Sequence, residues 1–420
     1  RRQRQMCIRD RSITMQKAGL HLKEQDARLR KSVFEKMAAR RSSDIADIDT
    51  LFDTLIQKRT ELAKNAGFEN YRDYKFKEMG RFDYTKESCF EFHDSVEQHI
   101  VPLVKKIHKE RLAKMNKDIF RPWDTVVNAE GKAPLKPFET GKEMLDGTIA
   151  VFEKINPEFS GFLKTMEEMK HFDLESKPGK APGGYNYPLY ETGAPFIFMN
   201  AVGSQGDVST MIHEGGHAIH SFLTHKLELT AFKSFPSEIA ELASMSMELL
   251  TLEHWDEFYH KADDLNRAKK EQLQGTITIL PWIAQIDAFQ HWIYENHNHT
   301  AAERTTYWME LNKRFGTGLV DWTGHEETLA SSWQRQMHLF EVPFYYIEYG
   351  IAQLGAIGVW KNSKTNFEES IENYRSALSL GYTKSMPEVY ARAGIDFKFS
   401  GDHICMLADF VASELEKLDT

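Results

Sequence analysis

The sequence predicts a mostly α-helical protein with one small β-sheet, and three observations support this class. Apolar residues recur at helical spacing over most of residues 22–116, and again nearly without interruption from residue 207 onward. Between these parts, residues 175–207 are rich in glycine and proline. Within that segment, the runs YNYPLY and PFIFMN have the length and composition of strands, and we expect them to form a small antiparallel sheet.

The helical part before residue 116 contains two well-marked helices. The run SDIADIDTLFDTLIQKRTELAKNAGF places its apolar residues on one helical face, and Gly67 is a typical helix stop. A second helix begins with a capping-box-like pair, Thr85 and Ser88, and Pro102 predicts a kink or break within it. Loop and short strands are expected over 121–138, and further helix near 140–170.

The composition excludes several classes of protein. The chain has 420 residues, 41% of them hydrophobic, and a formal net charge of -9. This acidic balance argues against a general nucleic-acid binder. The longest apolar runs fall far short of the roughly 20 residues that span a bilayer, so no membrane insertion is expected. Cys7, Cys89 and Cys405 lie far apart without a CxxC pair, which predicts no disulfide framework, no cysteine zinc site and a reducing compartment.

The first twelve residues, RRQRQMCIRDRS, differ sharply in character from the rest of the chain. They are rich in arginine and contain no apolar stretch of the kind found in signal peptides. We therefore expect residues 1–12 to be a non-native, adapter-derived segment or a disordered basic tail, and we assign the folded domain to residues 13–420.

The stretch MIHEGGHAIHSF, residues 211–222, carries the strongest chemical signal. Asp207 or Ser209 can cap a helix that continues to about residue 224. On it, His213 and His217 differ by about 40° around the axis and about 6 Å along it, so both can face one ion. Imidazole is a good zinc ligand, and Glu214 can reach a metal-bound water without binding the metal, as in HExxH motifs.

The alternative is a core helix whose histidines hydrogen-bond to their neighbours. Gly215 and Gly216 argue against an ordinary core helix, because each costs about 0.8–1 kcal/mol relative to alanine. They favour the close approach of a substrate or a neighbouring element. His220 lies about 10 Å along the axis from His213, so we expect it beside the ligands or in the core rather than on the metal.

A catalytic zinc needs a third protein ligand. The helix predicted over FPSEIAELASMSMELL, residues 235–250, offers Glu238, Glu241 and Glu248 among small and apolar residues. A buried carboxylate needs a partner, and a metal ion is one. Spacing alone does not choose between the three glutamates.

At this point the chain resembles the oligoendopeptidase F and Pz-peptidase group of zinc oligopeptidases, relatives of thimet oligopeptidase. The resemblance covers residues 40–400 in the order of the family. It rests on the following motifs: GFENYRDY, RPWD, PFIFMN, HEGGHAIH, AELASMSME, HLFEVPFYYIEYGIAQLGA and GYTKSMPEVYARAGIDF.

The resemblance implies roles for individual residues. Glu241 is then the third metal ligand, Glu248 holds a ligating imidazole in its tautomer, and Glu238 is structural. A histidine and tyrosines of the later motif would stabilise the oxyanion; we assign His338, Tyr345 and Tyr349, with Tyr346 as the alternative or as a substrate contact. Aromatic core packing is the alternative for each tyrosine. The strand formed by Phe196, Ile197, Phe198, Met199 and Asn200 would be an edge strand that binds peptide substrate.

The resemblance also implies a thermolysin-like HExxH zincin within a two-lobed helical oligopeptidase. We expect one Zn²⁺ per chain and hydrolysis of internal bonds in short, unfolded oligopeptides, with Glu214 as the proton carrier. A dipeptidyl carboxypeptidase or a non-catalytic peptide-binding relative is the alternative. We further expect a cytoplasmic monomer or homodimer, and an N-terminal lobe that is incomplete.

Overall fold

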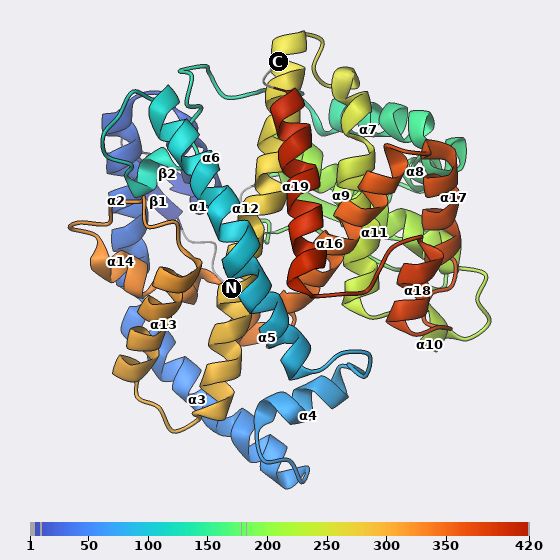
Figure 1. The fold of residues 1–420 in the computed structure, drawn as a ribbon. Coiled ribbons are helices and arrows are strands. Elements are labelled where there is room, and N and C mark those ends of the chain that lie inside the picture. The colour runs from blue at the N-terminus through green and yellow to red at the C-terminus, as the bar shows by residue number, and fades with distance from the viewer. Residues whose placement is uncertain (1–4, 9–10, 178, 182, 419–420) are drawn as a thin grey trace.

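The computed structural model describes residues 5–8, 11–177, 179–181 and 183–418, and gives only the backbone for residues 5–8, 11–14 and 16. Most of these residues are helical, as the sequence predicts (Figure 1). The helices before the sheet are α1 (Met15–Leu20), α2 (Ala27–Ser42), α3 (Ile45–Asn65), α4 (Tyr71–Glu78), α5 (Lys86–Ser95), α6 (Val101–Lys114), α7 (Gly141–Ile155) and α8 (Pro157–Glu168).

After the sheet the chain is again almost continuously helical. The helices of this part are α9 (Gln205–Thr224), α10 (Thr230–Lys233), α11 (Ser237–Leu250), α12 (Ala262–Glu295), α13 (Ala301–Phe315), α14 (Glu326–Ala330), α15 (His338–Glu341), α16 (Tyr346–Ser363), α17 (Phe367–Leu378), α18 (Met386–Arg392) and α19 (Gly401–Lys417). Short 3₁₀ turns lie at His21–Lys23, Pro122–Asp124, Leu252–Glu257 and Ser332–Arg335.

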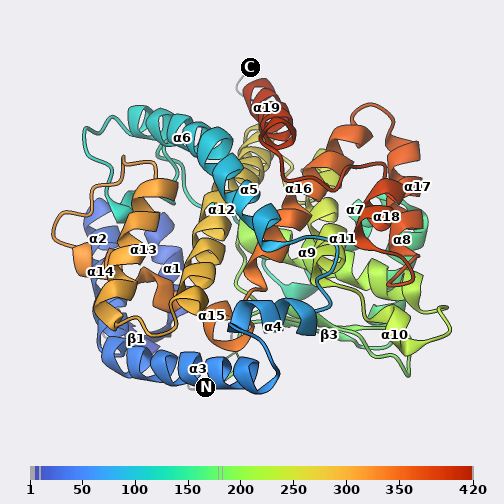
Figure 2. The same cartoon turned by 60° about the horizontal axis from the view of Figure 1, so that its bottom comes forward.

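The long helix α12 runs through the middle of the molecule and is buried along much of its length. Figures 1 and 2 show α2, α3, α13 and α14 gathered on one side of it, and α7 to α11 with α16 to α18 on the other. Helix α12 packs against α13 in the first group and against α16 in the second. This arrangement agrees with the two-lobed helical body that the sequence predicts.

The local signals at the helix ends are confirmed. Thr85 and Ser88 form the expected capping box at the start of α5. Gly67 follows α3 with a φ of 83°, a left-handed conformation that glycine adopts without strain. The break expected near Pro102 is a π-helical turn, Val96–Ile100, which joins α5 to α6 without a gap, and the proline is the second residue of α6.

The sheet has three strands, β3 (Phe172–Glu175), β4 (Tyr185–Tyr187) and β5 (Phe196–Ala201), in the order β3-β5-β4. Strand β4 pairs antiparallel with β5, but β3 pairs parallel with it, so the sheet is mixed rather than antiparallel. The four residues of β3, FDLE, alternate apolar and polar side chains, but so short a run is a weak signal, and no strand is predicted there from the sequence. Because β5 is the central strand, the prediction that it is a free edge strand is wrong; β4 forms an edge instead.

Two further strands, β1 (Gln5–Ile8) and β2 (Arg11–Thr14), pair antiparallel near the start of the chain. They include part of the segment that we predicted to be non-native or disordered; residues 1–4 and 9–10 of that segment lie outside the described residues. The origin of residues 1–12 stays a prediction. Among the described residues, no helix is both long enough and apolar enough to cross a membrane.

Candidate active site

Helix α9, which carries the histidine motif, begins at Gln205. This is two residues before Asp207, the earlier of the two predicted caps, Asp207 and Ser209. Ser204 is the N-cap, and the Asp207 carboxylate accepts hydrogen bonds from the backbone N–H groups of Ser204 and Val202 at 2.8 and 2.9 Å. Asp207 is therefore the third residue of a capping box rather than the cap itself. The helix ends at Thr224, as predicted.

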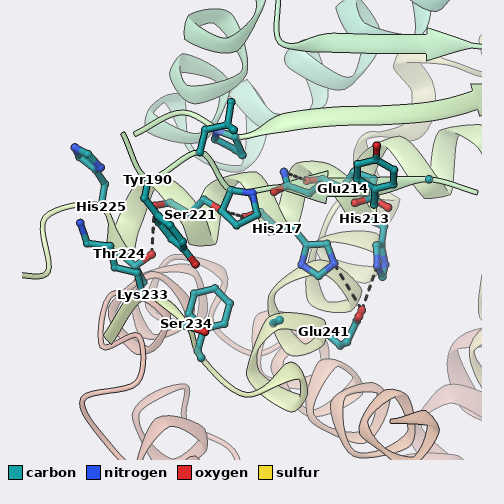
Figure 3. Close-up of a pocket in the computed structure, with 18 of the residues that line it drawn as sticks. Tyr190, His213, Glu214, His217, Ser221, Thr224, His225, Lys233, Ser234 and Glu241 are labelled. Atoms are coloured by element: carbon teal, nitrogen blue, oxygen red, sulfur yellow. Dashed lines mark hydrogen bonds and ion pairs between the residues drawn. The ribbon is translucent and has the colours of Figure 1, made fainter. Parts of the chain in front are cut away.

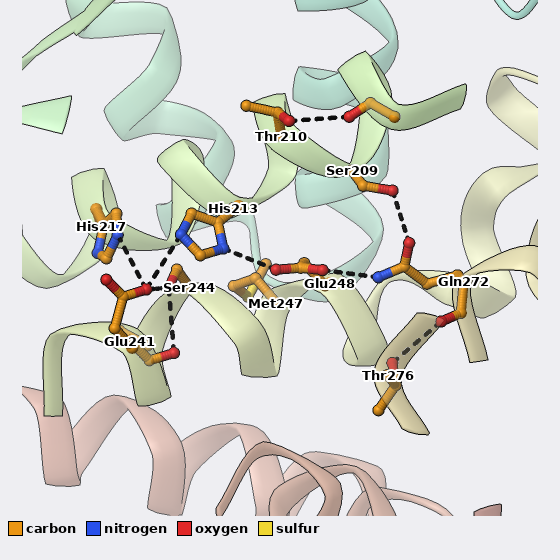
Figure 4. A network of polar contacts seen from close by, with 12 residues as sticks. Ser209, Thr210, His213, His217, Glu241, Ser244, Met247, Glu248, Gln272 and Thr276 are labelled. Carbon is orange, nitrogen blue, oxygen red and sulfur yellow. Dashed lines mark hydrogen bonds and ion pairs between the residues drawn. The ribbon is translucent and has the colours of Figure 1, made fainter. Parts of the chain in front are cut away.

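The side chains of His213, His217 and Glu241 converge between α9 and α11 (Figures 3 and 4). The Nε2 atoms of His213 and His217 lie 3.2 and 3.7 Å from Oε2 of Glu241. One nitrogen of each imidazole and one oxygen of the carboxylate all lie within 4.8 Å of one another, a spacing that can hold one metal ion. Of the three glutamates that spacing left open, Glu241 lies next to both histidines, whereas Glu248 contacts His213 alone.

The two glycines of the motif allow α9 to pack closely against its neighbours. A Cβ atom on Gly216 would lie 2.6 Å from the Cα of Ser244 in α11, and one on Gly215 would lie 2.7 Å from the Phe152 ring of α7. The close approach that we expected from these glycines is therefore that of neighbouring helices. This contact sets the distance between the helix of the histidines and the helix of Glu241.

A chain of hydrogen bonds fixes the His213 ring from behind (Figure 4). Its Nδ1 lies 2.7 Å from Oε1 of Glu248. Gln272 of α12 donates from Nε2 to the other Glu248 oxygen at 2.7 Å and accepts from the Ser209 hydroxyl at 2.7 Å. When Nδ1 of His213 donates to Glu248, the lone pair of its Nε2 is directed at the cluster. Gln272 was missed at the sequence level because it is one polar residue in a long helix.

The pKa values of His217 and Glu241 suit a metal ion. Burial lowers the pKa of His217 to about 4, which keeps its imidazole neutral, the form that binds metal ions. Burial raises the pKa of Glu241, but the hydrogen bond with His213 and the charges of the two histidines outweigh burial and bring that pKa to about 2. Two imidazole nitrogens and one ionised carboxylate are the donor set of several catalytic zinc sites.

Glu214 lies beside this cluster and lines the same cavity. Its side chain is buried, and Oε2 has no hydrogen-bond partner. Burial raises the pKa of this carboxyl to about 7. A buried carboxylate that has one free oxygen and a pKa near neutral pH is suited to accept and return a proton.

The tyrosine segment reaches the cluster from the start of α16. The Tyr345 hydroxyl donates to Oε1 of Glu241 at 3.0 Å, and both Tyr345 and Tyr349 line the cavity. Nε2 of His338 lies 3.4 Å from the Tyr349 hydroxyl. Tyr346 is buried, packs on the His338 ring and does not line the cavity, so the structure does not place it as a substrate contact.

A strained residue precedes these tyrosines. Phe344 has a φ of 67°, which is unusual for a bulky side chain. Its N–H donates to Oε1 of Gln290 at 2.5 Å, and its carbonyl accepts from Nη2 of Arg81 at 2.8 Å. These two buried side chains hold the backbone in a conformation that sets the direction of the chain just before Tyr345.

Two other predicted residues lie away from the metal cluster. His220 is fully buried, stacks on the Phe235 ring at a centroid distance of 3.5 Å, and has no hydrogen-bond partner, so it belongs to the core rather than to the support of the ligands. Glu238 accepts a hydrogen bond from the Tyr84 hydroxyl at 2.6 Å and lies 3.8 Å from Arg81, which agrees with the structural role predicted for it.

The cavity has a volume of about 480 Å³, which is within the usual range for ligand sites. Strand β4 and the loop after it form one wall, and α9, α11 and the tyrosine segment form others (Figure 3). The wall includes Tyr185 and Asn186, and Asn186 also donates from Nδ2 to the backbone carbonyl of Glu214 at 3.3 Å. The side chains of β5, residues 196–200, do not line it.

In this helical fold the HExxH helix packs against a helix that brings a glutamate to its two histidines, an arrangement typical of metallopeptidases. The chain belongs to peptidase family M3, whose model matches residues 20–405. It is similar to the plasmid oligoendopeptidase F of Lactococcus lactis subsp. cremoris, with 26% identity over 292 residues, 67% of this chain and 46% of that protein. Oligopeptidase PepF of Bacillus subtilis is 24% identical over 290 residues, 66% of this chain and 42% of that protein. The chain thus spans about half the length of the curated relatives it matches.

Solved structures share the fold. Pz peptidase A, solved with an inhibitor, superposes with a TM-score of 0.93 and 28% identity, covering 98% of this chain and 72% of that one. A putative oligoendopeptidase F from Bacillus anthracis superposes with a TM-score of 0.87 and 25% identity, covering 98% of this chain and 71% of that one.

Proposed function

We propose that this protein is a zinc metalloendopeptidase that hydrolyses internal bonds of short, unfolded oligopeptides. The observation that carries the proposal is the position of the buried Glu214 carboxylate, with one oxygen unpartnered, beside the convergent side chains of His213, His217 and Glu241 in one cavity. The names of the relatives, oligoendopeptidase F and oligopeptidase PepF, support the same activity and the same class of substrate.

His213, His217 and Glu241 would hold the zinc ion. Their donor atoms fit it in type and spacing, and Glu248 holds the His213 ring so that its Nε2 stays available. When bound, zinc supplies a Lewis acid that polarises the scissile carbonyl and acidifies water.

The protein's own groups carry the proton and stabilise the charge. Glu214 takes the proton from the attacking water and delivers it to the leaving amine, a task that suits its pKa of about 7. The Tyr349 hydroxyl, oriented by His338, donates a hydrogen bond to the oxyanion. The Tyr345 hydroxyl, which donates to Glu241 in the structure, turns to the oxyanion as the second donor. Burial raises the pKa of both tyrosines, so they remain neutral donors at ordinary pH.

The peptide binds in extended form along β4. This strand is an edge strand next to the cavity, and an edge presents backbone groups that can pair with another extended chain. Backbone pairing gives affinity without requiring a particular sequence. Tyr185 and Tyr187 are exposed on β4 and offer aromatic surface to the substrate's side chains.

The test combines metal content with cleavage of an internally quenched peptide. We expect the zinc-loaded chain to cleave a peptide blocked at both ends, and Glu214→Gln to keep its zinc while losing cleavage at least 100-fold. Equal activity of the Glu214→Gln variant would refute the mechanism. Cleavage that requires a free C-terminus would instead identify a dipeptidyl carboxypeptidase. Zinc-dependent peptide binding without cleavage would identify a peptide-binding relative. A cytoplasmic location and a monomeric or homodimeric state stay predictions.

A further inference from the structure

A second cluster of metal-ligating side chains lies between α5 and α12. Cys89 comes from α5, and Asp287 and His291 come from α12. All three are buried, and one ligand atom from each lies within 4.8 Å of the other two. Among the described residues, only this cluster and that of His213, His217 and Glu241 have this property.

The two helices present these groups in a regular pattern. Asp287 and His291 are four residues apart and so share one face of α12. On α5, Cys89 is followed four residues later by His93, whose Nε2 lies 2.9 Å from Oδ2 of Asp287. Nε2 of His291 lies 3.2 Å from the same oxygen. Four residues of metal-binding type thus face one another across the helix pair.

Several atoms of the cluster lack partners. Asp287 has an exposed fraction of 0%, and its Oδ1 accepts no hydrogen bond. Nδ1 of the buried His291 has no hydrogen-bond partner, and its Nε2 has only the 3.2 Å contact with Asp287. Among the described residues, the ion pairs of Asp287 are with His93 and His291 and not with an arginine or a lysine. A fully buried carboxylate with one unpartnered oxygen is costly unless a further group neutralises it.

We propose that Cys89, Asp287 and His291 bind a second metal ion, zinc, and that His93 orients the Asp287 carboxylate. A thiolate and a carboxylate together carry two negative charges, which a divalent ion cancels inside the protein. Sulfur and imidazole ligands favour zinc over magnesium and calcium, which prefer oxygen. A hydrogen bond from His93 to a ligating carboxylate is the kind of outer contact that holds metal ligands in place.

The position of this site indicates a structural role. The cluster is closed from solvent, unlike the cavity at Glu214, and structural zinc sites are closed. His291 packs edge-on against the Phe344 ring at a centroid distance of 5.4 Å, and the preceding residue, Gln290, accepts the Phe344 N–H. An ion here ties α5 to α12 next to the strained turn that precedes Tyr345.

The competing explanation is a proton shared between Asp287 and the two histidines, with no metal. In that case Cys89 is an ordinary buried thiol, and a purified chain holds one zinc ion. With the second site, a zinc-loaded chain holds two, and one of them has a sulfur ligand. The cluster of His213, His217 and Glu241 contains no sulfur ligand, so zinc–sulfur bonding comes from Cys7, Cys89 or Cys405, which cysteine variants distinguish.

The decisive experiment is zinc quantification and zinc X-ray absorption on the unaltered chain. We expect two equivalents of zinc and a zinc–sulfur path at about 2.3 Å. One equivalent with only nitrogen and oxygen neighbours would overturn the proposal and leave the proposed peptidase activity intact. This measurement needs no variant, so it decides even if a substitution prevents folding.

Cobalt(II) substitution then assigns the ligand. Thiolate bound to cobalt(II) gives a charge-transfer band in the near ultraviolet. We expect Cys89→Ser to abolish this band and to lower metal content from two equivalents to one, with a helical circular dichroism spectrum retained. The matched controls Cys7→Ser and Cys405→Ser should keep both the band and the two equivalents. A band that survives Cys89→Ser, or disappears in either control, would contradict the assignment.

Discussion

Oε1 of Glu248 lies 2.7 Å from Nδ1 of His213, on the side of the imidazole opposite to Glu241. The contact joins α11 to α9 and fixes which ring nitrogen can face a metal. Gln272 of α12 extends it through a further hydrogen bond to the other Glu248 oxygen, so three helices share in orienting one imidazole.

Removing this support should weaken metal binding. We expect Glu248→Ala to lower zinc affinity by about 10-fold to 100-fold, because His213 loses the partner that holds its ring and its tautomer. Competition with a chelator of known affinity measures the effect, and saturating zinc should restore most of the activity. The exposed Glu228→Ala is the control. Unchanged affinity in the Glu248 variant would show that the contact has no role in metal binding.

The roles of Tyr345 and Tyr346 can be distinguished by substitution, because only Tyr345 lines the cavity. Tyr345→Phe should lower kcat by about 10²-fold to 10³-fold, because a hydrogen-bond donor to the oxyanion is lost. KM should change little, and the assay contains saturating zinc because the Tyr345 hydroxyl also donates to the metal ligand Glu241. Tyr346→Phe is the matched control, since Tyr346 lies next in sequence but does not line the cavity. Steady-state kinetics on a quenched peptide compare the two, and an equal loss in both would contradict the assignment of Tyr345 over Tyr346.

The sequence predicted the parts of the site that one helix can present. His213, His217 and Glu214 lie within five positions, so helix geometry alone relates them. Glu241 could be chosen only through the family resemblance, because three glutamates of one helix have the same residue type and similar surroundings. Gln272 and Gln290 support the site from α12, and Arg81 supports it from the connection between α4 and α5. A single polar residue carries no local signal of a partner that is distant in sequence.

In the fold, too, features with local sequence signals were predictable and features set by tertiary packing were not. Helices and their caps were predictable, since their signals are local: Gly67, the Thr85 capping box and the break near Pro102 all agree with the structure. The strand order was not, because the pairing of β3 with β5 joins segments separated by β4 and depends on tertiary packing. The position of β5 at the centre of the sheet therefore overturned the edge strand inferred from resemblance.

The packing of α9 on α11 makes a prediction about stability. Gly216→Ala should lower the free energy of unfolding by about 1–3 kcal/mol, because the new methyl group would lie 2.6 Å from the Ser244 Cα and backbone cannot easily move away. Gly275→Ala in α12 is the control: nothing lies within 4 Å of its Cβ position, and we expect a gain of about 0.5–1 kcal/mol. Urea unfolding measures both. A neutral Gly216 variant would show that the helices can separate freely.

A final prediction concerns acid stability far from the site. Burial, assisted by the charge of Arg111, lowers the pKa of His108 to about 4, while the unfolded chain keeps the ordinary value of about 6.5. Between pH 6.5 and pH 4 the His108 imidazole is protonated in the unfolded chain but neutral in the folded one. The contribution of His108 to the free energy of unfolding is therefore fully present above about pH 6.5 and is lost as the pH falls toward 4.

His108→Gln removes this titration and keeps a polar side chain near Thr317, the present hydrogen-bond partner of the ring at 3.2 Å. The loss of unfolding free energy between pH 7 and pH 5 should therefore be about 2 kcal/mol smaller in the variant than in the unaltered chain. Urea unfolding of both chains at the two pH values measures this difference. Because both chains keep the same active site, its own titration cancels in the comparison. Equal losses in the two chains would show that the folded state does not hold His108 neutral.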